Sequence, residues 1–202
     1  MRTRTVKTYF EAEDVTEDER QTTIRIWEAN WRKRGWSTKV LTPANAAQHP
    51  RFREFLERCV NATPPENPAK YGVERWIRWL AFALDGGGLL VDFDVLNRAY
   101  PQANIPNGTD IVILARESRP CAVLATKEGA ERLVNDILAH KPPYTDHFSY
   151  MYFFMQGGKY PTSELCIEAG DTDWQEAPLV HYSGNACRLA ERNKHEWMKE
   201  LA

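Results

Sequence analysis

The sequence has few cysteines and no long apolar run, and these absences exclude several classes of protein. Its four cysteines among 202 residues show no CxxC spacing, so we predict reduced core thiols and neither a zinc site nor a disulfide framework. No apolar stretch approaches the ~20 residues of a transmembrane helix. The first ten residues lack the apolar core of a secretion signal, so we expect a cytoplasmic protein.

An excess of charge of one sign is also missing. Lys and Arg number 26 and Asp and Glu 28, a formal net charge of −2, which gives no overall basic field for nucleic acid or a membrane surface. The apolar share of 43% and the charged share of 27% are ordinary for a soluble globular protein. Without repeats or a low-complexity linker, the length predicts a single domain over residues 1–202.

Stretches with the period of a strand alternate with stretches that have the period of a helix. This order predicts an α/β fold with a mixed, mostly parallel central sheet. The predicted strands cover residues 5–10, 36–41, 89–93, 110–115, 121–125 and 178–182. The predicted helices run from a capping box at Thr16 to about Arg34 and over residues 49–60, 73–84, 128–140, 144–155 and 185–201.

Residues 86–95, GGGLLVDFDV, place two carboxylates directly after a strand that is apolar along its whole length. On a strand, Asp92 and Asp94 point the same way and Phe93 points oppositely into packing. Ligand sites of open α/β sheets collect at this carboxyl end of the strands. Two carboxylates so close repel each other, and a divalent cation relieves the conflict. Oxygen ligands suit Mg²⁺ or Mn²⁺, and such a metal commonly also holds phosphate oxygens.

The chain contains a second Asp-x-Asp sequence, at residues 171–173. It lies in a polar stretch with no apolar strand before it, so we interpret it as a turn. The context of Asp92 and Asp94, and not the bare pattern, therefore carries the prediction of a metal site.

The segment 74–95, ERWIRWLAFALDGGGLLVDFDV, resembles the core of the sugar-binding DXD family of glycosyltransferases, which includes yeast mannosyltransferases and bacterial glucosylating toxins. The resemblance implies the GT-A fold, a Rossmann-like nucleotide-diphospho-sugar transferase fold. It implies that Asp92 and Asp94 bind Mn²⁺ on the diphosphate and that an arginine contacts the nucleotide sugar. That arginine is Arg78, although it precedes Gly87 by nine residues where the family has eight. Arg75, one helical turn earlier, is the alternative.

The sequence HYSG at residues 181–184 is similar to the HxxG of glycogenin-like transferases, which implies that His181 completes the metal site. Gly184 opens the last predicted helix, whose first amides can bind a diphosphate. In that family a lysine after the glycine binds phosphate. Cys187 stands at its spacing, and the neighbouring Arg188 is the candidate for its role.

Four further positions are candidates for the site. Tyr9 ends the first strand, where this fold places the nucleotide base. Gly87 and Gly88 would let the backbone pass close to the donor sugar. Asp146 precedes an aromatic segment, and is either an acceptor base or electrostatic stabiliser of the reaction or an ordinary helix cap.

These residues predict a metal-dependent, retaining glycosyltransferase that uses a nucleoside diphosphate sugar, with UDP as the expected nucleotide. Asp94 and Arg78 would act on the leaving diphosphate. The acceptor would be a hydroxyl of a glycan, a protein or a modified DNA base of a phage, in which case the location is the host cytoplasm. One alternative is a phosphatase of the haloacid dehalogenase type, with Asp92 as nucleophile and Asp94 as acid/base. Another is a non-catalytic sugar-nucleotide binder. The oligomeric state stays open.

Overall fold

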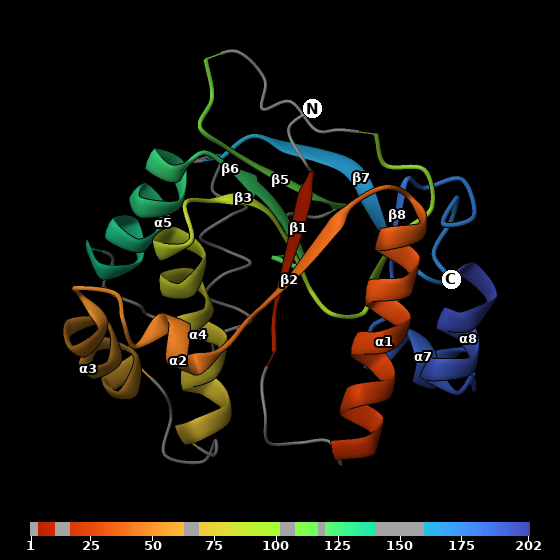
Figure 1. Cartoon of the computed structure of the whole chain (residues 1–202), viewed down its shortest axis with the longest axis horizontal. Coiled ribbons are helices and arrows are strands. Elements are labelled where there is room, and N and C mark those ends of the chain that lie inside the picture. The colour runs from red at the N-terminus through yellow and green to blue at the C-terminus, as the bar shows by residue number, and fades with distance from the viewer. Residues whose placement is uncertain (1–3, 11–16, 63–68, 102–107, 117–119, 140–159) are drawn as a thin grey trace.

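The described strands form one mixed sheet with helices on both of its faces (Figure 1). This computed structural model describes residues 4–10, 17–62, 69–101, 108–116, 120–139 and 160–202, with the backbone alone at 17–20, 59–62 and 69–75. The strand order is β2-β1-β3-β6-β5-β7-β8-β4. The strands are β1 (Thr5–Tyr9), β2 (Ser37–Leu41), β3 (Gly88–Val91), β4 (Val95–Asn97), β5 (Ile111–Ala115), β6 (Ala122–Ala125), β7 (Thr162–Glu168) and β8 (Leu179–His181).

Parallel pairings outnumber antiparallel ones among these strands. The pairs β1–β2, β1–β3, β5–β7 and β7–β8 are parallel, whereas β3–β6, β5–β6 and β4–β8 are antiparallel. The mixed, mostly parallel sheet predicted from the sequence is therefore confirmed.

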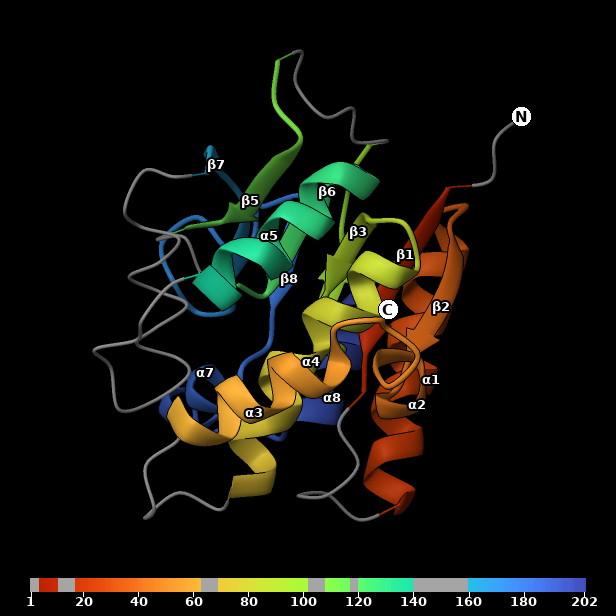
Figure 2. The ribbon, with the colours of Figure 1, turned by 90° about the vertical axis from the view of Figure 1, so that its left-hand side faces the viewer.

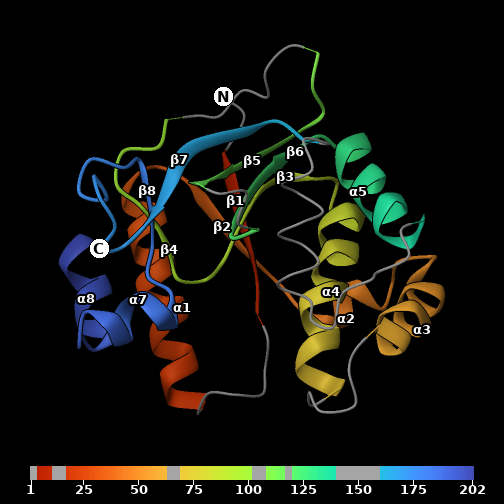
Figure 3. The same ribbon diagram turned by 180° about the vertical axis from the view of Figure 1, so that it is seen from behind.

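Two helical layers cover the sheet, and Figures 1 and 3 show them on opposite sides. Helices α2 to α5 form one layer, and Figure 2 faces it, while α1, α7 and α8 form the other. The helices are α1 (Glu17–Lys33), α2 (Pro43–Ala46), α3 (Phe52–Ala62), α4 (Ala69–Leu84), α5 (Lys127–Ala139), α7 (Gly184–Leu189) and α8 (Lys194–Leu201). None of the helices in the described part of the chain has the length and apolarity that crossing a bilayer requires.

Each layer encloses its own hydrophobic core, and β3 contributes to both. Leu89 and Val91 pack on the α1 side with Trp27 and Trp31, while Leu90 packs on the α4 side. This double burial explains why the strand is apolar at consecutive positions and does not alternate.

The sequence prediction joined two helices into one and missed the short helix α2 and two strands. The segment 185–201 forms two helices, because Glu191 has a positive φ of 52° and Asn193 begins a new helix as its N-cap. Strand β7 was missed because its first half is largely exposed and polar. Strand β4 was missed because it has only three residues. The predicted helix 144–155 lies outside the described residues.

The glycine turn before β3 ends helix α4 in a Schellman motif. Gly86 N–H donates to the Ala83 carbonyl (2.9 Å) and Gly87 N–H to the Phe82 carbonyl (3.1 Å). Gly86, Gly87 and Gly88 all have positive φ, between 70° and 97°. The connection from α4 to β3 thus accommodates all three glycines.

We expect alanine substitutions at Gly86 and Gly87 to differ sharply in their effect on stability. Both glycines have the left-handed backbone conformation, which costs a residue with a side chain about 1–2 kcal/mol. A Cβ at Gly86 meets nothing within 4 Å, whereas at Gly87 it would lie 2.7 Å from the Ala125 carbonyl oxygen and closer still to that of Thr126. Gly87→Ala should therefore lower the free energy of unfolding by at least about 3–4 kcal/mol. Urea denaturation of the two variants measures this, and equal losses would contradict the proposed close contact.

Candidate functional site

Asp92 and Asp94 lie on a turn at the carboxyl end of β3, and not on the strand itself. The strand ends at Val91, and Val95 N–H donates to the Asp92 carbonyl (2.9 Å), which closes the turn. The strand-alternation argument for their common direction was therefore wrong, although the two carboxylates do converge. Phe93 was expected in the core and is instead half-buried.

The register of β4 against β8 brings His181 to this carboxylate pair. Val95 lies opposite His181 in the antiparallel pairing, and Tyr182 N–H donates to the Asp94 carbonyl (2.9 Å). One ligand atom from each of Asp92, Asp94 and His181 lies within 4.8 Å of the others. Two carboxylates and an imidazole are ligands that suit Mn²⁺, and the oxygen ligands suit Mg²⁺. We name these three residues the carboxylate–histidine cluster.

Arg78 reaches the cluster from helix α4. Its Nη1 donates to Asp92 Oδ1 (2.8 Å) and its Nη2 to the Pro120 carbonyl (3.0 Å). The guanidinium also lies 4.5 Å from the Trp79 ring centroid, and the residue is buried. The longer spacing to the glycines therefore does not keep Arg78 from the site. The side chain of the alternative, Arg75, lies outside the described residues.

Lys194 is a site residue that the sequence reasoning missed. Its Nζ lies 2.7 Å from Asp94 Oδ2, while His181 Nε2 lies 3.3 Å from Asp94 Oδ1. Both carboxylate oxygens of Asp94 therefore face positive or hydrogen-bonding groups. The missed signal was Asn193 three residues before Glu196, the spacing of a helix N-cap, which would have started a helix at Lys194.

The pKa values of the site reflect a buried carboxylate held between cations. Burial alone would raise the pKa of Asp94, but Lys194 and His181 more than offset it and hold it well below its usual range. Burial would likewise lower the pKa of Lys194, yet Asp94 raises it. Asp94 is therefore ionised and Lys194 charged at neutral pH.

His181 also lies beside a buried thiol. A contact with Cys166 and burial raise the pKa of Cys121 well above its ordinary value, so that sulfur is uncharged at neutral pH. Burial opposes the charged ring of His181, but its neighbours Cys121 and Asp94 raise its pKa well above the ordinary value. Because the Cys121 thiol is uncharged, the negative charge that favours the protonated ring of His181 is that of Asp94. A metal would replace that proton, since it binds the neutral ring.

Other predicted site residues are not part of the cluster. Gly87 precedes β3 and Gly88 is its first residue, so they lie at the opposite end of this strand from Asp92. Tyr9 is buried in the core on the α4 side. Its neighbour Phe10, which was not selected from the sequence, packs edge-on against Phe93, with the two ring centroids 5.4 Å apart.

Two positions predicted to bind phosphate lie on the short helix α7. Gly184 is exposed at its start, where Ser183 is the N-cap and accepts from the Ala186 N–H. Arg188 is exposed and donates to Asn185 Oδ1 (2.7 Å), so Lys194, and not Arg188, is the cation beside Asp94. Asp146 lies outside the described residues.

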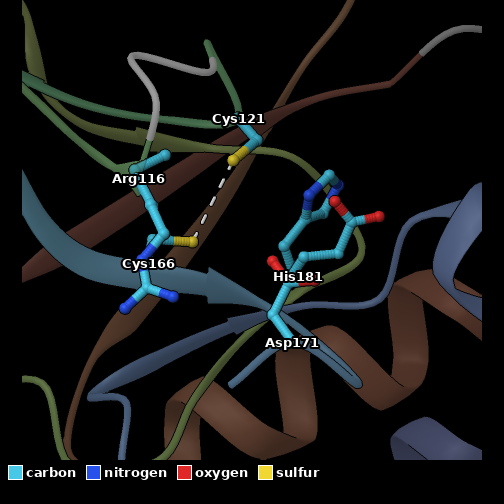
Figure 4. Close-up of a pocket in the computed structure, with 7 residues that line it drawn as sticks. Arg116, Cys121, Cys166, Asp171 and His181 are labelled. Atoms are coloured by element: carbon cyan, nitrogen blue, oxygen red, sulfur yellow. Dashed lines mark hydrogen bonds between the residues drawn. The ribbon is translucent and has the colours of Figure 1, made fainter. Parts of the chain in front are cut away.

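A small hollow lies beside His181, a member of the carboxylate–histidine cluster (Figure 4). Arg116, Cys121, Cys166 and Asp171 line it with His181. The Sγ atoms of Cys121 and Cys166 are 4.0 Å apart. Both cysteines, and Cys187, are buried free thiols, so the prediction of reduced core thiols is confirmed for these three residues. The second Asp-x-Asp sequence forms the predicted turn, with Asp173 at a positive φ of 65°.

Comparison with known proteins yields a structural relative. No protein-family model matches the chain, and no curated protein matches it in sequence. Among solved structures, the chain is similar to a glycosyltransferase involved in the glycosylation of the major capsid of PBCV-1. The TM-score is 0.56 at 13% identity, over 98% of this chain and 100% of that one. At this identity the likeness shows the fold alone, and the glycosyltransferase fold expected from the sequence is confirmed.

Proposed function

We propose that this chain is a metal-dependent glycosyltransferase that takes its sugar from a nucleoside diphosphate sugar. The observation that carries the proposal is the convergence of Asp92, Asp94 and His181 at the carboxyl edge of the sheet. Their ligand atoms come from two places in the chain about ninety residues apart, and they lie on a fold shared with a glycosyltransferase. Asp92, Asp94 and His181 would hold Mn²⁺ or Mg²⁺, which when bound would neutralise charge on the leaving diphosphate.

The protein groups around the cluster would hold and orient the reactants. Arg78 fixes Asp92 through its 2.8 Å hydrogen bond and would add positive charge beside the diphosphate. We propose UDP as the nucleotide and retention of the stereochemistry at the anomeric carbon, as the family resemblance implies. The attacking group would be a hydroxyl of a glycan, a protein or a modified DNA base. The structural relative is involved in glycosylation of a capsid, which is why a protein stays among the acceptors to be tested.

The phosphatase alternative has less support from the same contacts. It needs an unencumbered Asp92 as nucleophile, but Arg78 binds an oxygen of that carboxylate. Its distal acidic motif would be Asp171 and Asp173, which are not members of the carboxylate–histidine cluster. The glycosyltransferase fold also favours the first proposal.

A thermal-shift panel of nucleotide sugars with and without Mn²⁺ tests the proposal. A ligand at one hundred times its Kd stabilises by about 2.7 kcal/mol, which for a chain of this size raises Tm by about 5–10 °C. We expect a shift of this order with one donor, and only when Mn²⁺ is also present. The absence of a shift with every donor tested would contradict the proposal.

Release of nucleoside diphosphate separates a transferase from a non-catalytic binder. With donor and metal but no acceptor, a transferase should slowly transfer the sugar to water, and this hydrolysis releases nucleoside diphosphate. A binder would show the same thermal shift and no release. Burst release of phosphate from a phosphomonoester would instead support the phosphatase.

A further inference from the structure

The ammonium of Lys194 binds one of the two carboxylate oxygens of Asp94, the buried member of the carboxylate–histidine cluster. Asp94 is buried, with Lys194 Nζ 2.7 Å from Oδ2 and His181 Nε2 3.3 Å from Oδ1. Resting on the proposed function, we propose that Lys194 is an exchangeable counter-ion. It holds Asp94 in place before the donor binds, and it moves to the diphosphate when metal and nucleotide sugar bind together.

Charge repulsion makes Lys194 and a divalent cation competitors for Asp94. A metal held by Asp94 would place a second positive charge close to the ammonium that is hydrogen-bonded to the same carboxylate. Like charges that share a partner in a buried site repel each other. The buried state of the Asp94 carboxylate limits screening by water and salt. Metal binding therefore requires Lys194 to leave.

Helix α8 can stay in place while the lysine side chain moves. Lys194 is the first residue of α8, and the N-cap Asn193 accepts from the Glu196 N–H. Trp197 and Met198 are buried on the inner side of this helix, which fixes its backbone. The Lys194 side chain is 27% exposed, with its ammonium 5.8 Å from the Phe93 ring. Because the four-carbon side chain of Lys194 is flexible and partly exposed, its ammonium can move while the helix stays in place.

An incoming diphosphate supplies both the new partner for Lys194 and the remaining ligands for the metal. Metal alone must break the Lys194–Asp94 pair without replacing it, so it binds weakly. With the nucleotide present, the ammonium exchanges one anion for another. Metal and nucleotide therefore each strengthen the binding of the other, and this coupling is reciprocal.

The test is Mn²⁺ binding to Lys194→Met, measured without nucleotide by titration calorimetry and by the electron paramagnetic resonance signal of free Mn²⁺. Removing the competing charge should tighten Mn²⁺ binding about tenfold, and UDP should then enhance it less than in the wild type. Lys194→Arg retains the charge and should keep the weak binding. Lys199→Met is the matched control on the same helix, since Lys199 pairs with Glu196 and should leave Mn²⁺ affinity unchanged.

Unchanged or weaker Mn²⁺ binding in Lys194→Met would overturn the inference. If that variant does not fold because Asp94 loses its partner, Lys194→Gln replaces it, since the amide keeps a hydrogen-bond donor without the charge, and the same tightening is expected. Asp94→Asn in the wild-type background separates the two proposals. If Asp94→Asn abolishes Mn²⁺ binding while Lys194→Met does not tighten it, the metal site stands and only this inference fails. If Asp94→Asn leaves Mn²⁺ binding unchanged, the metal site itself is refuted.

Discussion

Asp94→Asn is expected to lower metal-dependent turnover by at least about a thousand-fold, equivalent to about 4 kcal/mol of transition-state stabilisation. Asp94 is the buried member of the cluster and faces both His181 and Lys194. An amide has the same shape but lacks the charge that holds a divalent cation and fixes the two cationic partners. The measurement is nucleoside diphosphate release with Mn²⁺ and the donor found by thermal shift.

The second Asp-x-Asp sequence provides the matched control for Asp94. Asp173 is exposed in a turn and belongs to no cluster of metal-ligand residues in the described part of the chain, so Asp173→Asn should leave turnover within about twofold. Equal losses in the two variants would contradict the assignment of the metal site.

The turnover of Asp94→Asn should be measured near neutral pH. Because the folded pKa of Asp94 is lowered, its ionic contribution to stability is fully present above the unfolded pKa of about 3.9. That contribution disappears only as the pH falls through the folded pKa. At pH 7 to 8 the comparison therefore reports loss of the charge and not a change in protonation. Tm values of both variants show how much of the effect is loss of folding, which a broken buried pair can cause.

The sequence predicted which residues meet at the site better than it predicted how they meet. Asp92, Asp94 and His181 were selected by their places at strand ends and Arg78 by the family resemblance, and the structure brings these four together. Convergence at the carboxyl edge follows from sheet topology, which the alternation of elements reveals. The turn that carries both carboxylates was not foreseen, because an apolar strand followed by Asp-Phe-Asp has the same alternation whether or not the ladder continues.

Lys194 shows why the remainder of the site was hidden. It lies one hundred residues from Asp94 along the chain, and in a continuous helix over residues 185–201 it would have been one more charged residue on a solvated face. Only the break at Glu191 and the new start at Asn193 turn this lysine toward the sheet. Left-handed residues other than glycine have a weak sequence signature, so such a break is difficult to predict.

Arg78→Met should lower turnover by about a hundred-fold or more and cost about 2–3 kcal/mol of stability, because Asp92 and the Pro120 carbonyl both lose a charged donor. Arg78→Lys should recover little of this. The guanidinium reaches Asp92 with Nη1 and Pro120 with Nη2, and a single ammonium does not span both with the same geometry. Turnover against donor concentration, with Tm for each variant, separates catalysis from folding.

Arg75→Met decides between the two arginines of helix α4. If Arg78 is the arginine that acts on the donor, Arg75→Met should keep kcat and KM within about twofold of the wild type, while Arg78→Met changes them strongly. A loss confined to Arg75→Met would show that Arg75, and not the arginine in contact with Asp92, binds the donor. The Schellman turn argues against that result, because it holds α4 against β3 with Arg78 already on Asp92. The additional glycine then lies in the connection between helix and strand, at the end of β3 opposite the carboxylates.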